Sequence, residues 1–271
     1  MHEIAGRVAV ITGGANGIGR GTALAMAREG VRLVLADMDA AALDEAVGAV
    51  AAIGGQARAF RCDVRDDAAF PALREATLAA FGRVDIVMNN VGVIASGLPQ
   101  DIPAAEWQRI LDINFLSIVR ANNTFLPDLL ARGEGHIVNT ASFAALFPYA
   151  YDRLPYMASK AAVIALSEGL SLYLRPRGIG VTCLLPGPVR TQIGRTVKRW
   201  GTAELPLRGP GPQFRMLEPD EVGVMVVDAI RRNVFFLPTD PQIRAIIAAR
   251  AADPEGFLAA QIAAVNSPEG A

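Results

Sequence analysis

Seven short runs rich in apolar and β-branched residues alternate with segments of helical periodicity along the chain, and this alternation constrains the fold more than any other feature. Strands that alternate with helices form βαβ units, which build a parallel sheet with helices on both faces. Hydrophobic residues make up 52% of the chain, as expected for strands buried on both sides. We therefore predict an α/β fold with a doubly wound, seven-stranded parallel sheet. The predicted strands are 7–12, 32–36, 57–62, 84–89, 136–140, 181–185 and 234–237.

The chain of 271 residues is predicted to form one domain, residues 1–271, because its length suits a single α/β core with a few insertions. Two segments interrupt the alternation. Residues 186–219 are rich in proline and glycine and form a connection long enough to indicate a lid or binding loop. Residues 241–265 are alanine-rich and amphipathic, which predicts a C-terminal helical extension.

Charge and cysteine content exclude several classes of protein. The 26 basic and 27 acidic residues leave a net charge of −1, so no positive footprint predicts binding to nucleic acid or to an anionic membrane surface. No apolar run is long enough for a membrane span, and the N-terminus does not resemble a signal peptide. Cys62 and Cys183 lie in predicted strands and are expected to be buried, reduced thiols. We therefore expect a cytoplasmic protein. We also expect no metal site, because the histidines, cysteines and carboxylates do not stand at the spacing of metal ligands.

A glycine-rich loop, Thr12-Gly13-Gly14-Ala15-Asn16-Gly17-Ile18-Gly19, follows the first predicted strand and opens the first helix. Glycines at such a junction let backbone N–H groups and the positive end of the helix approach a pyrophosphate. A purely structural turn is the alternative for any single glycine, but a strand before and a helix after favour a phosphate site. The loop therefore predicts dinucleotide binding.

The second predicted strand is followed by Asp37, whose carboxylate could accept hydrogen bonds from the adenosine ribose hydroxyls and repel a 2′-phosphate. The alternative role is that of a helix cap, for which Asp39 competes. No basic residue stands at positions 14–16 to pair with a 2′-phosphate. The sequence thus favours NAD over NADP as the cofactor.

Tyr156 and Lys160 are four residues apart, which places a phenol and an ammonium on one face of a helix. A phenol titrates near ~10, and a nearby cation would lower its pKa toward values useful for proton transfer. The alternative is that the two residues simply lie on a solvent-exposed helix face, as most such pairs do. Lys160 is, however, one of only two lysines in a chain that otherwise uses arginine, the other being Lys198, and this favours a functional role.

Ser142 lies just beyond the fifth predicted strand, at the edge where open α/β sheets bind ligands. Its hydroxyl could donate to a substrate oxygen while Tyr156 gives or takes the proton, although a turn serine is the common alternative. Asn114 is polar inside an apolar helical run, where an asparagine is normally neutral to unfavourable.

The conjunction of these motifs resembles the short-chain dehydrogenase/reductase (SDR) family, in its branch of roughly 250 residues with TGxxxGxG and YxxxK motifs. Asp63-Val64, Asn89-Asn90-Val91-Gly92, Pro186-Gly187 and Thr191 are similar to further family elements, with Val91 departing from the usual alanine. The resemblance implies a Rossmann fold and a catalytic tetrad of Asn114, Ser142, Tyr156 and Lys160, in which Asn114 supports a proton relay through water. It implies the cofactor-binding residues Gly13, Asn16, Gly17, Ile18, Gly19, Asp37, Asp63, Val64, Asn90, Gly92, Tyr156, Lys160, Pro186, Gly187, Val189 and Thr191.

We therefore predict an NAD-dependent oxidoreductase acting on a small-molecule secondary alcohol or ketone. The alternatives are an NADP-dependent ketone reductase and a catalytically silent dinucleotide-binding protein. Self-association is also predicted, as a homotetramer or homodimer. A bulky, apolar substrate is favoured because large apolar residues follow the fifth and sixth predicted strands, although each could instead pack the lid onto the body. These residues are Phe143, Leu146, Phe147, Tyr149, Trp200, Leu205, Phe214, Met216 and Leu217.

Overall fold

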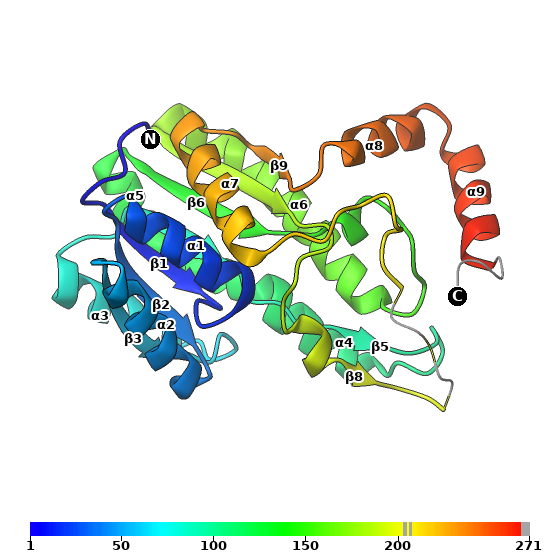
Figure 1. Ribbon diagram of the computed structural model, residues 1–271, viewed down its shortest axis with the longest axis horizontal. Coiled ribbons are helices and arrows are strands. Elements are labelled where there is room, and N and C mark those ends of the chain that lie inside the picture. The colour runs from blue at the N-terminus through cyan, green and yellow to red at the C-terminus, as the bar shows by residue number, and fades with distance from the viewer. Residues whose placement is uncertain (203–204, 206–207, 267–271) are drawn as a thin grey trace.

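The computed structural model describes residues 1–202, 205 and 208–266, and its centre is a seven-stranded parallel sheet (Figure 1). The strand order, β3-β2-β1-β4-β6-β7-β9, confirms the doubly wound α/β fold. The chain winds outward from β1 in one direction and then returns to build the other half from β4. The strands are β1 (Val8–Thr12), β2 (Arg32–Asp37), β3 (Gln56–Arg61), β4 (Ile86–Asn89), β6 (Gly135–Thr140), β7 (Ile179–Leu185) and β9 (Phe236–Pro238).

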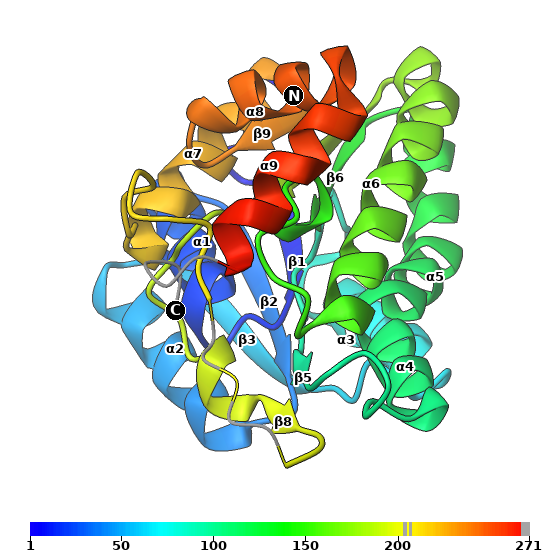
Figure 2. The ribbon, with the colours of Figure 1, turned by 90° about the vertical axis from the view of Figure 1, so that its right-hand side faces the viewer.

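Helices cover both faces of this sheet (Figure 2). In β1, Ala9 and Ile11 pack toward α1, α2 and α7, whereas Val10 packs toward α3 and α5 on the opposite face. This alternation follows from the period of two along a strand. In β7, Val181 and Cys183 pack on the α5 and α6 side. The helices are α1 (Gly17–Arg28), α2 (Ala40–Ala52), α3 (Ala69–Phe81), α4 (Ala104–Leu111), α5 (Ser117–Arg132), α6 (Leu154–Leu174) and α7 (Pro219–Arg232).

Local signals in the sequence set most helix ends. Gly82 ends α3 with a left-handed φ of 76°, a conformation that glycine adopts without a steric penalty. Helix α7 begins at a capping box in which the side chains of Glu218 and Glu221 each accept a backbone N–H, so two orphan donors of the first turn are satisfied.

Several boundaries differ from the predicted ones. Strand β4 begins at Ile86 rather than at residue 84, because the buried Asp85 carboxylate accepts the Val8 N–H and pairs with Arg83 and Arg132. Strand β3 ends at Arg61, so Cys62 lies just beyond the strand and not within it. Both cysteines are free and buried, as expected.

A small second sheet was not predicted. Strand β5 (Ala95–Ser96) pairs in parallel with β8 (Lys198–Arg199), which joins the segment after β4 to the segment after β7. Strands of two residues are too short to show a periodicity, so no sequence pattern predicts them. Lys198 also pairs with the buried Glu106 of α4 at 3.3 Å. The segment 186–219 is thus attached to the body at β8; its residues 203–204 and 206–207 lie outside the described part of the chain.

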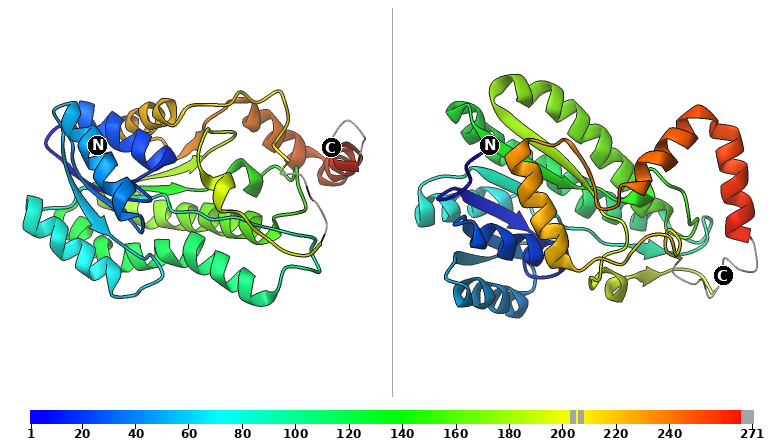
Figure 3. Two further views of the ribbon diagram at one scale, coloured as in Figure 1. Left: turned by 60° about the horizontal axis from the view of Figure 1, so that its bottom comes forward. Right: turned by 45° about the horizontal axis from the view of Figure 1, so that its top comes forward.

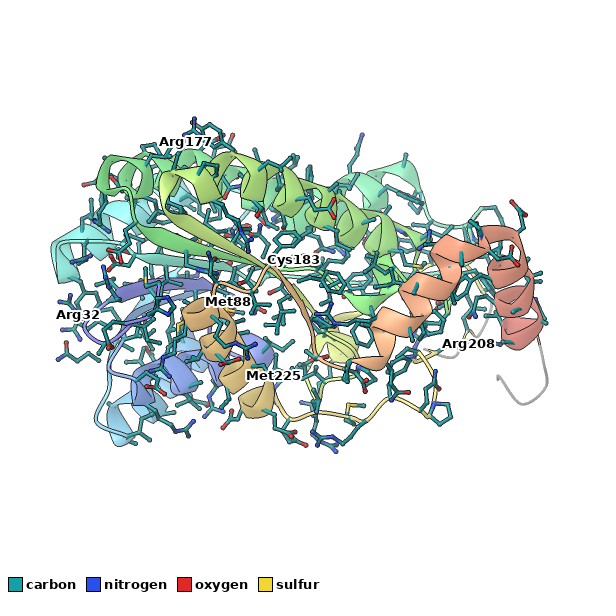
Figure 4. The ribbon with its side chains drawn as sticks, turned by 90° about the horizontal axis from the view of Figure 1, so that it is seen from above. Arg32, Met88, Arg177, Cys183, Arg208 and Met225 are labelled. Atoms are coloured by element: carbon teal, nitrogen blue, oxygen red, sulfur yellow. The ribbon has the colours of Figure 1, made fainter. Side chains whose placement is uncertain are left out.

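Two helices follow β9: α8 (Gln242–Ala252) and α9 (Pro254–Asn266). Both views in Figure 3 show α9 at the outer end of the molecule, and Figure 4 places Arg208 beside it. The Arg208 guanidinium donates to the Val265 carbonyl of α9. The assignment of residues 1–271 to one domain stays a prediction, and residues 267–271 lie outside the described range.

Within the described residues, no helix has the length and apolar character needed to cross a membrane.

Candidate active site

A cavity of about 640 Å³ opens where the chain leaves the carboxyl ends of β1, β2, β3, β4, β6 and β7. This is the edge at which open parallel sheets bind ligands. The predicted site residues that line it are Gly13, Asn16, Gly17, Ile18, Asp37, Asp63, Val64, Asn90, Gly92, Ser142, Tyr156, Lys160, Pro186, Gly187, Val189 and Thr191. The cavity is therefore lined by all but two of the predicted catalytic and cofactor-binding residues, and those two are Gly19 and Asn114.

The glycine-rich loop is built so that side chains could not replace its glycines. Gly13 and Gly17 have left-handed φ values of 64° and 52°. A Cβ atom on Gly19 would lie 2.0 Å from the Gly13 carbonyl oxygen, far inside van der Waals contact, so Gly19 closes the turn from behind rather than lining the cavity. The bare loop leaves backbone at the wall, next to the N-terminus of α1, where the helix dipole favours a bound anion.

Hydrogen bonds from neighbouring strand ends hold this loop in place. The Asn90 side-chain NH₂ donates to the Gly13 backbone carbonyl at 3.2 Å, and the Thr140 hydroxyl donates to the Asn90 side-chain oxygen Oδ1 at 3.2 Å. The Asn90 N–H donates to the Thr12 hydroxyl. The ends of β1, β4 and β6 are thus tied together beneath the cavity.

The two candidate roles for aspartate after β2 are divided between two residues. Asp39 is the N-cap of α2 and accepts the Ala42 N–H at 3.1 Å. Asp37 accepts the Met38 N–H at 2.8 Å and lines the cavity. The helix-capping alternative for Asp37 is therefore wrong, because Asp39 occupies that position.

Helix α6 carries Tyr156 and Lys160 one turn apart on the face that meets the cavity. The Lys160 ammonium lies 5.9 Å from the centre of the Tyr156 ring and donates to the Thr140 carbonyl at 2.8 Å. Ser142, just after β6, lines the same cavity, and its hydroxyl acts to lower the pKa of Tyr156. Phenol, hydroxyl and ammonium thus meet at one wall of the cavity.

The protonation properties of this wall differ from the prediction. Burial raises the pKa of Tyr156, and the Ser142 hydrogen bond and the charge of Arg153 only partly oppose it. Burial also lowers the pKa of Lys160 to about 8. Both shifts follow from desolvation, which disfavours each charged form. The expected lowering of the Tyr156 pKa by Lys160 is therefore not what this wall produces.

Asn114 lies behind the cavity in a π-helical turn, Asp112–Leu116, between α4 and α5. Its side-chain oxygen Oδ1 accepts the Val93 N–H at 2.9 Å. Its side-chain NH₂ donates to the Val93 backbone carbonyl and to the Ser159 hydroxyl, both at 3.0 Å. The Ser159 hydroxyl in turn donates to the Tyr156 carbonyl at 2.7 Å. Asn114 therefore joins the segment after β4 to the helix that carries Tyr156.

The large apolar residues expected to form the substrate wall do not line the cavity. The rings of Phe143 and Phe214 pack edge to face, with 5.4 Å between their centres. Phe147 packs against Phe214 and against Phe257 of α9. For these residues the packing alternative is correct. Of the predicted wall residues, Tyr149 packs in the apolar cluster of Tyr156, together with Ile94, Ala144, Met157, Ile193 and Val197.

Sequence reasoning missed other residues of the lining. Most stand directly before or after a predicted site residue in the chain, as Cys62 precedes Asp63 and Met38 follows Asp37, so adjacency could have found them. Arg109 of α4 gave no such signal, because its position depends on how α4 packs. The missed lining residues are Met38, Asp39, Cys62, Arg65, Val91, Val93, Arg109, Ile113, Thr140, Ala141, Gln192 and Ile193. No cluster able to hold a metal ion occurs among the described residues.

Comparisons with known proteins point to one family. The family model for short chain dehydrogenases matches residues 7–201. Probable oxidoreductase EphD of Mycobacterium tuberculosis is 36% identical over 245 residues; the match covers 87% of this chain but only 41% of EphD. LinX of Sphingobium indicum, a 2,5-dichloro-2,5-cyclohexadiene-1,4-diol dehydrogenase, is 31% identical over 210 residues, which is 76% of this chain and 84% of LinX. A crystal structure of an SDR protein from Burkholderia phymatum in complex with NAD superposes with a TM-score of 0.83 at 33% identity, covering 94% of this chain and 96% of that chain.

Proposed function

The chain belongs to the short-chain dehydrogenase/reductase family, and from that premise we propose that it is an NAD-dependent oxidoreductase that interconverts a bulky, apolar secondary alcohol and its ketone. The observation that carries the proposal is the meeting of Ser142, Tyr156 and Lys160 at one wall of the 640 Å³ cavity. The glycine-rich loop and Asp37 line the same cavity.

The residues present suit a nicotinamide dinucleotide. The side-chain-free loop at Gly13 and Gly17 would hold the pyrophosphate, Asp37 the adenosine ribose, and Thr191 with Pro186 and Gly187 the nicotinamide end. Gly92 leaves room beside Lys160, because a Cβ atom there would lie 3.3 Å from the ammonium nitrogen. When bound, such a cofactor supplies or accepts the hydride.

The chain's own residues handle the proton. The Ser142 hydroxyl orients the substrate oxygen, and the Tyr156 hydroxyl gives a proton to that oxygen or takes one from it. The Lys160 ammonium lies 5.9 Å from the centre of the phenol ring, and it would bind the nicotinamide ribose of the cofactor. Asn114 and Ser159 fix the helix that carries both groups.

The preference for NAD is proposed from Asp37. Its carboxylate lines the cavity at the end of β2, where a negative charge repels a 2′-phosphate. Arg65 lines the same region, but its guanidinium is bound by Asp63 at 2.6 Å. The proposed preference for the cofactor without the extra phosphate therefore rests on the Asp37 carboxylate.

The substrate class is proposed from the apolar residues around Tyr156. Ile94 and Ala144 are buried beside it, and Ile193 and Val197 reach it from the segment after β7, which we propose as the lid over the substrate. Pockets for such ligands are mostly apolar with few polar anchors. The relative LinX is named for the dehydrogenation of a cyclic diol, which supports alicyclic alcohols as first candidates.

A panel of alicyclic, aryl and small polyol alcohols, with the matching ketones, tests the proposal. Formation or loss of reduced cofactor is followed by absorbance, with NAD and NADP in parallel and the Tyr156→Phe protein as the blank. We expect turnover with NAD and alicyclic or aryl secondary alcohols. Cofactor binding without turnover on any alcohol would favour a catalytically silent dinucleotide-binding protein. High efficiency on small polyols alone would overturn the apolar substrate class.

A further inference from the structure

A buried ion pair stands immediately before the helix that carries Tyr156. The Arg153 Nε atom donates to the Asp152 carboxylate at 3.0 Å, and the two side chains are only 8% and 6% exposed. Burying two charges costs more free energy than a well-packed apolar pair unless their hydrogen bonds are satisfied. Arg153 precedes Tyr156 by three residues, which is about one helical turn.

Hydrogen bonds from the neighbouring sheet fix the pair. The Ser96 hydroxyl of β5 donates to the Asp152 carboxylate at 3.0 Å, and the Gly97 N–H donates to the Asp152 carbonyl at 2.8 Å. Arg153 is the N-cap residue of α6, and its carbonyl accepts the Met157 N–H at 3.1 Å. The guanidinium is therefore held in a set place relative to the first turn of α6.

In that place the guanidinium lies over Tyr149, a neighbour of Tyr156. The Arg153 guanidinium lies 5.8 Å from the centre of the Tyr149 ring, and Tyr149 packs against the apolar cluster that contains Tyr156. Arg153 lowers the pKa of Tyr156, against the raising effect of burial. Both Arg153 and Asp152 act on the pKa of Tyr149, which burial raises to about 12.

The other groups that face Tyr156 leave Arg153 a distinct role. Ser142 and Tyr149 face the phenol from the segment after β6, and the segments before β5 and after β7 present apolar side chains. Lys160 is the second cation, but its pKa of about 8 means that it loses charge as the pH rises into the range where phenolate forms. An arginine keeps its charge at every accessible pH.

We propose that Arg153, held by Asp152 and Ser96, is a positioning residue whose permanent buried charge favours the phenolate of Tyr156 and sets the pH range in which the site works. The inference rests on the proposed function, because it takes Tyr156 as the proton-transferring group. It adds a second, pH-independent cation to the one that Lys160 provides.

Two variants of opposite charge effect test the inference. Arg153→Gln removes the positive charge but can still donate to Asp152, and it is expected to move the Tyr156 titration to higher pH by about half a unit to one unit. The sign is the same whether Asp152 stays ionised or takes up a proton. Asp152→Asn leaves the guanidinium without its counter-charge, so the shift is expected toward lower pH.

Two readouts follow the titration. The pH dependence of kcat/KM reports it in the working enzyme, and ¹³C NMR of tyrosine labelled at Cζ reports the Tyr156 phenol in the protein without cofactor or substrate. The Tyr156→Phe protein assigns the resonance. The NMR readout separates Tyr156 from Lys160, whose titration is coupled to it in the rate profile. If no alcohol is turned over, the proposed function fails, while the NMR still measures the effect of Arg153.

Arg177→Gln is the matched control. Arg177 also lies over a tyrosine ring, that of Tyr173 at 4.1 Å, but it follows the far end of α6 (Figure 4). This variant is expected to leave both readouts of Tyr156 unchanged. Where Arg153→Gln does not fold, the neutral double variant Asp152→Asn with Arg153→Gln takes its place, with a shift to higher pH expected. A loss of rate by the same factor at every pH, with an unmoved Tyr156 resonance, would show that the pair is purely structural.

Discussion

Replacing Lys160 with methionine is expected to stabilise the fold near neutral pH while abolishing turnover. Lys160 is only 2% exposed, and burial lowers its pKa from 10.5 to about 8. Because the folded-state pKa lies below the unfolded one, the unfolded chain binds more protons between these two values. The buried lysine therefore destabilises the fold fully below about pH 8, and this cost disappears as the pH rises through 10.5.

The size of the effect follows from the two pKa values. With these two pKa values, the buried lysine lowers the free energy of unfolding by roughly 3 kcal/mol at pH 7 and by only about 1 kcal/mol at pH 10. Methionine fills a similar volume without a charge, but it loses the hydrogen bond from the Lys160 ammonium to the Thr140 carbonyl, which is worth about 1 kcal/mol. The free energy of unfolding should therefore rise by about 2 kcal/mol at pH 7 and stay nearly unchanged at pH 10.

Urea unfolding of the cofactor-free protein at both pH values measures this difference. The control is Lys198→Met, at the other lysine, whose side chain is 52% exposed and pairs with Glu106; no gain at pH 7 is expected from it. A Lys160→Met protein that is less stable than the wild type at pH 7, or equally changed at both pH values, would refute the reasoning. The same variant should bind the cofactor more weakly, since the Lys160 ammonium is proposed to bind the nicotinamide ribose.

Three further predictions concern the site and the assembly. Tyr156→Phe should lower turnover by about 10²-fold or more and leave the cofactor Kd, measured by calorimetry, within a few-fold; activity close to that of the wild type would contradict the proton-transfer role. Asp37→Ala should reduce the preference for NAD over NADP, measured as the ratio of kcat/KM for the two cofactors. Equal use of NADP by the wild type would show that Asp37 does not repel a 2′-phosphate. A homotetramer or homodimer is proposed because Leu116 and Leu172 leave apolar side chains 41% and 81% exposed, and light scattering that finds a monomer at micromolar concentration excludes it.

Much of the fold could be predicted because its signals are local. Each buried strand is a short apolar run, and the alternation of strands and helices implies a parallel sheet whatever the order of the strands. The glycine-rich loop needs left-handed backbone at Gly13 and Gly17, which residue type alone can indicate. Tyr156 and Lys160 share a helix face because of helical geometry, so their juxtaposition also followed from spacing.

The boundaries that failed depend on distant partners. Strand β4 starts two residues later than predicted because the Asp85 carboxylate accepts the Val8 N–H and pairs with Arg132, which is distant in the chain. The β5 and β8 pair joins residues about a hundred positions apart, and no period exists in two residues. Asn114 was found as an anomaly in an apolar helix, but the π-helical turn that aims it at Val93 and Ser159 was not foreseen.

The sequence by itself determined the order of the elements, the side-chain-free phosphate loop and the residue types that meet at the carboxyl edge of the sheet. Only the tertiary structure decided that Asp39 caps α2 while Asp37 is left to line the cavity, and that Phe143 and Phe214 pack into the core. It also decided the direction of the Tyr156 and Lys160 pKa shifts. The reason is physical: backbone conformation and periodicity depend on near neighbours in the chain, whereas burial and electrostatic environment depend on groups that only folding brings together.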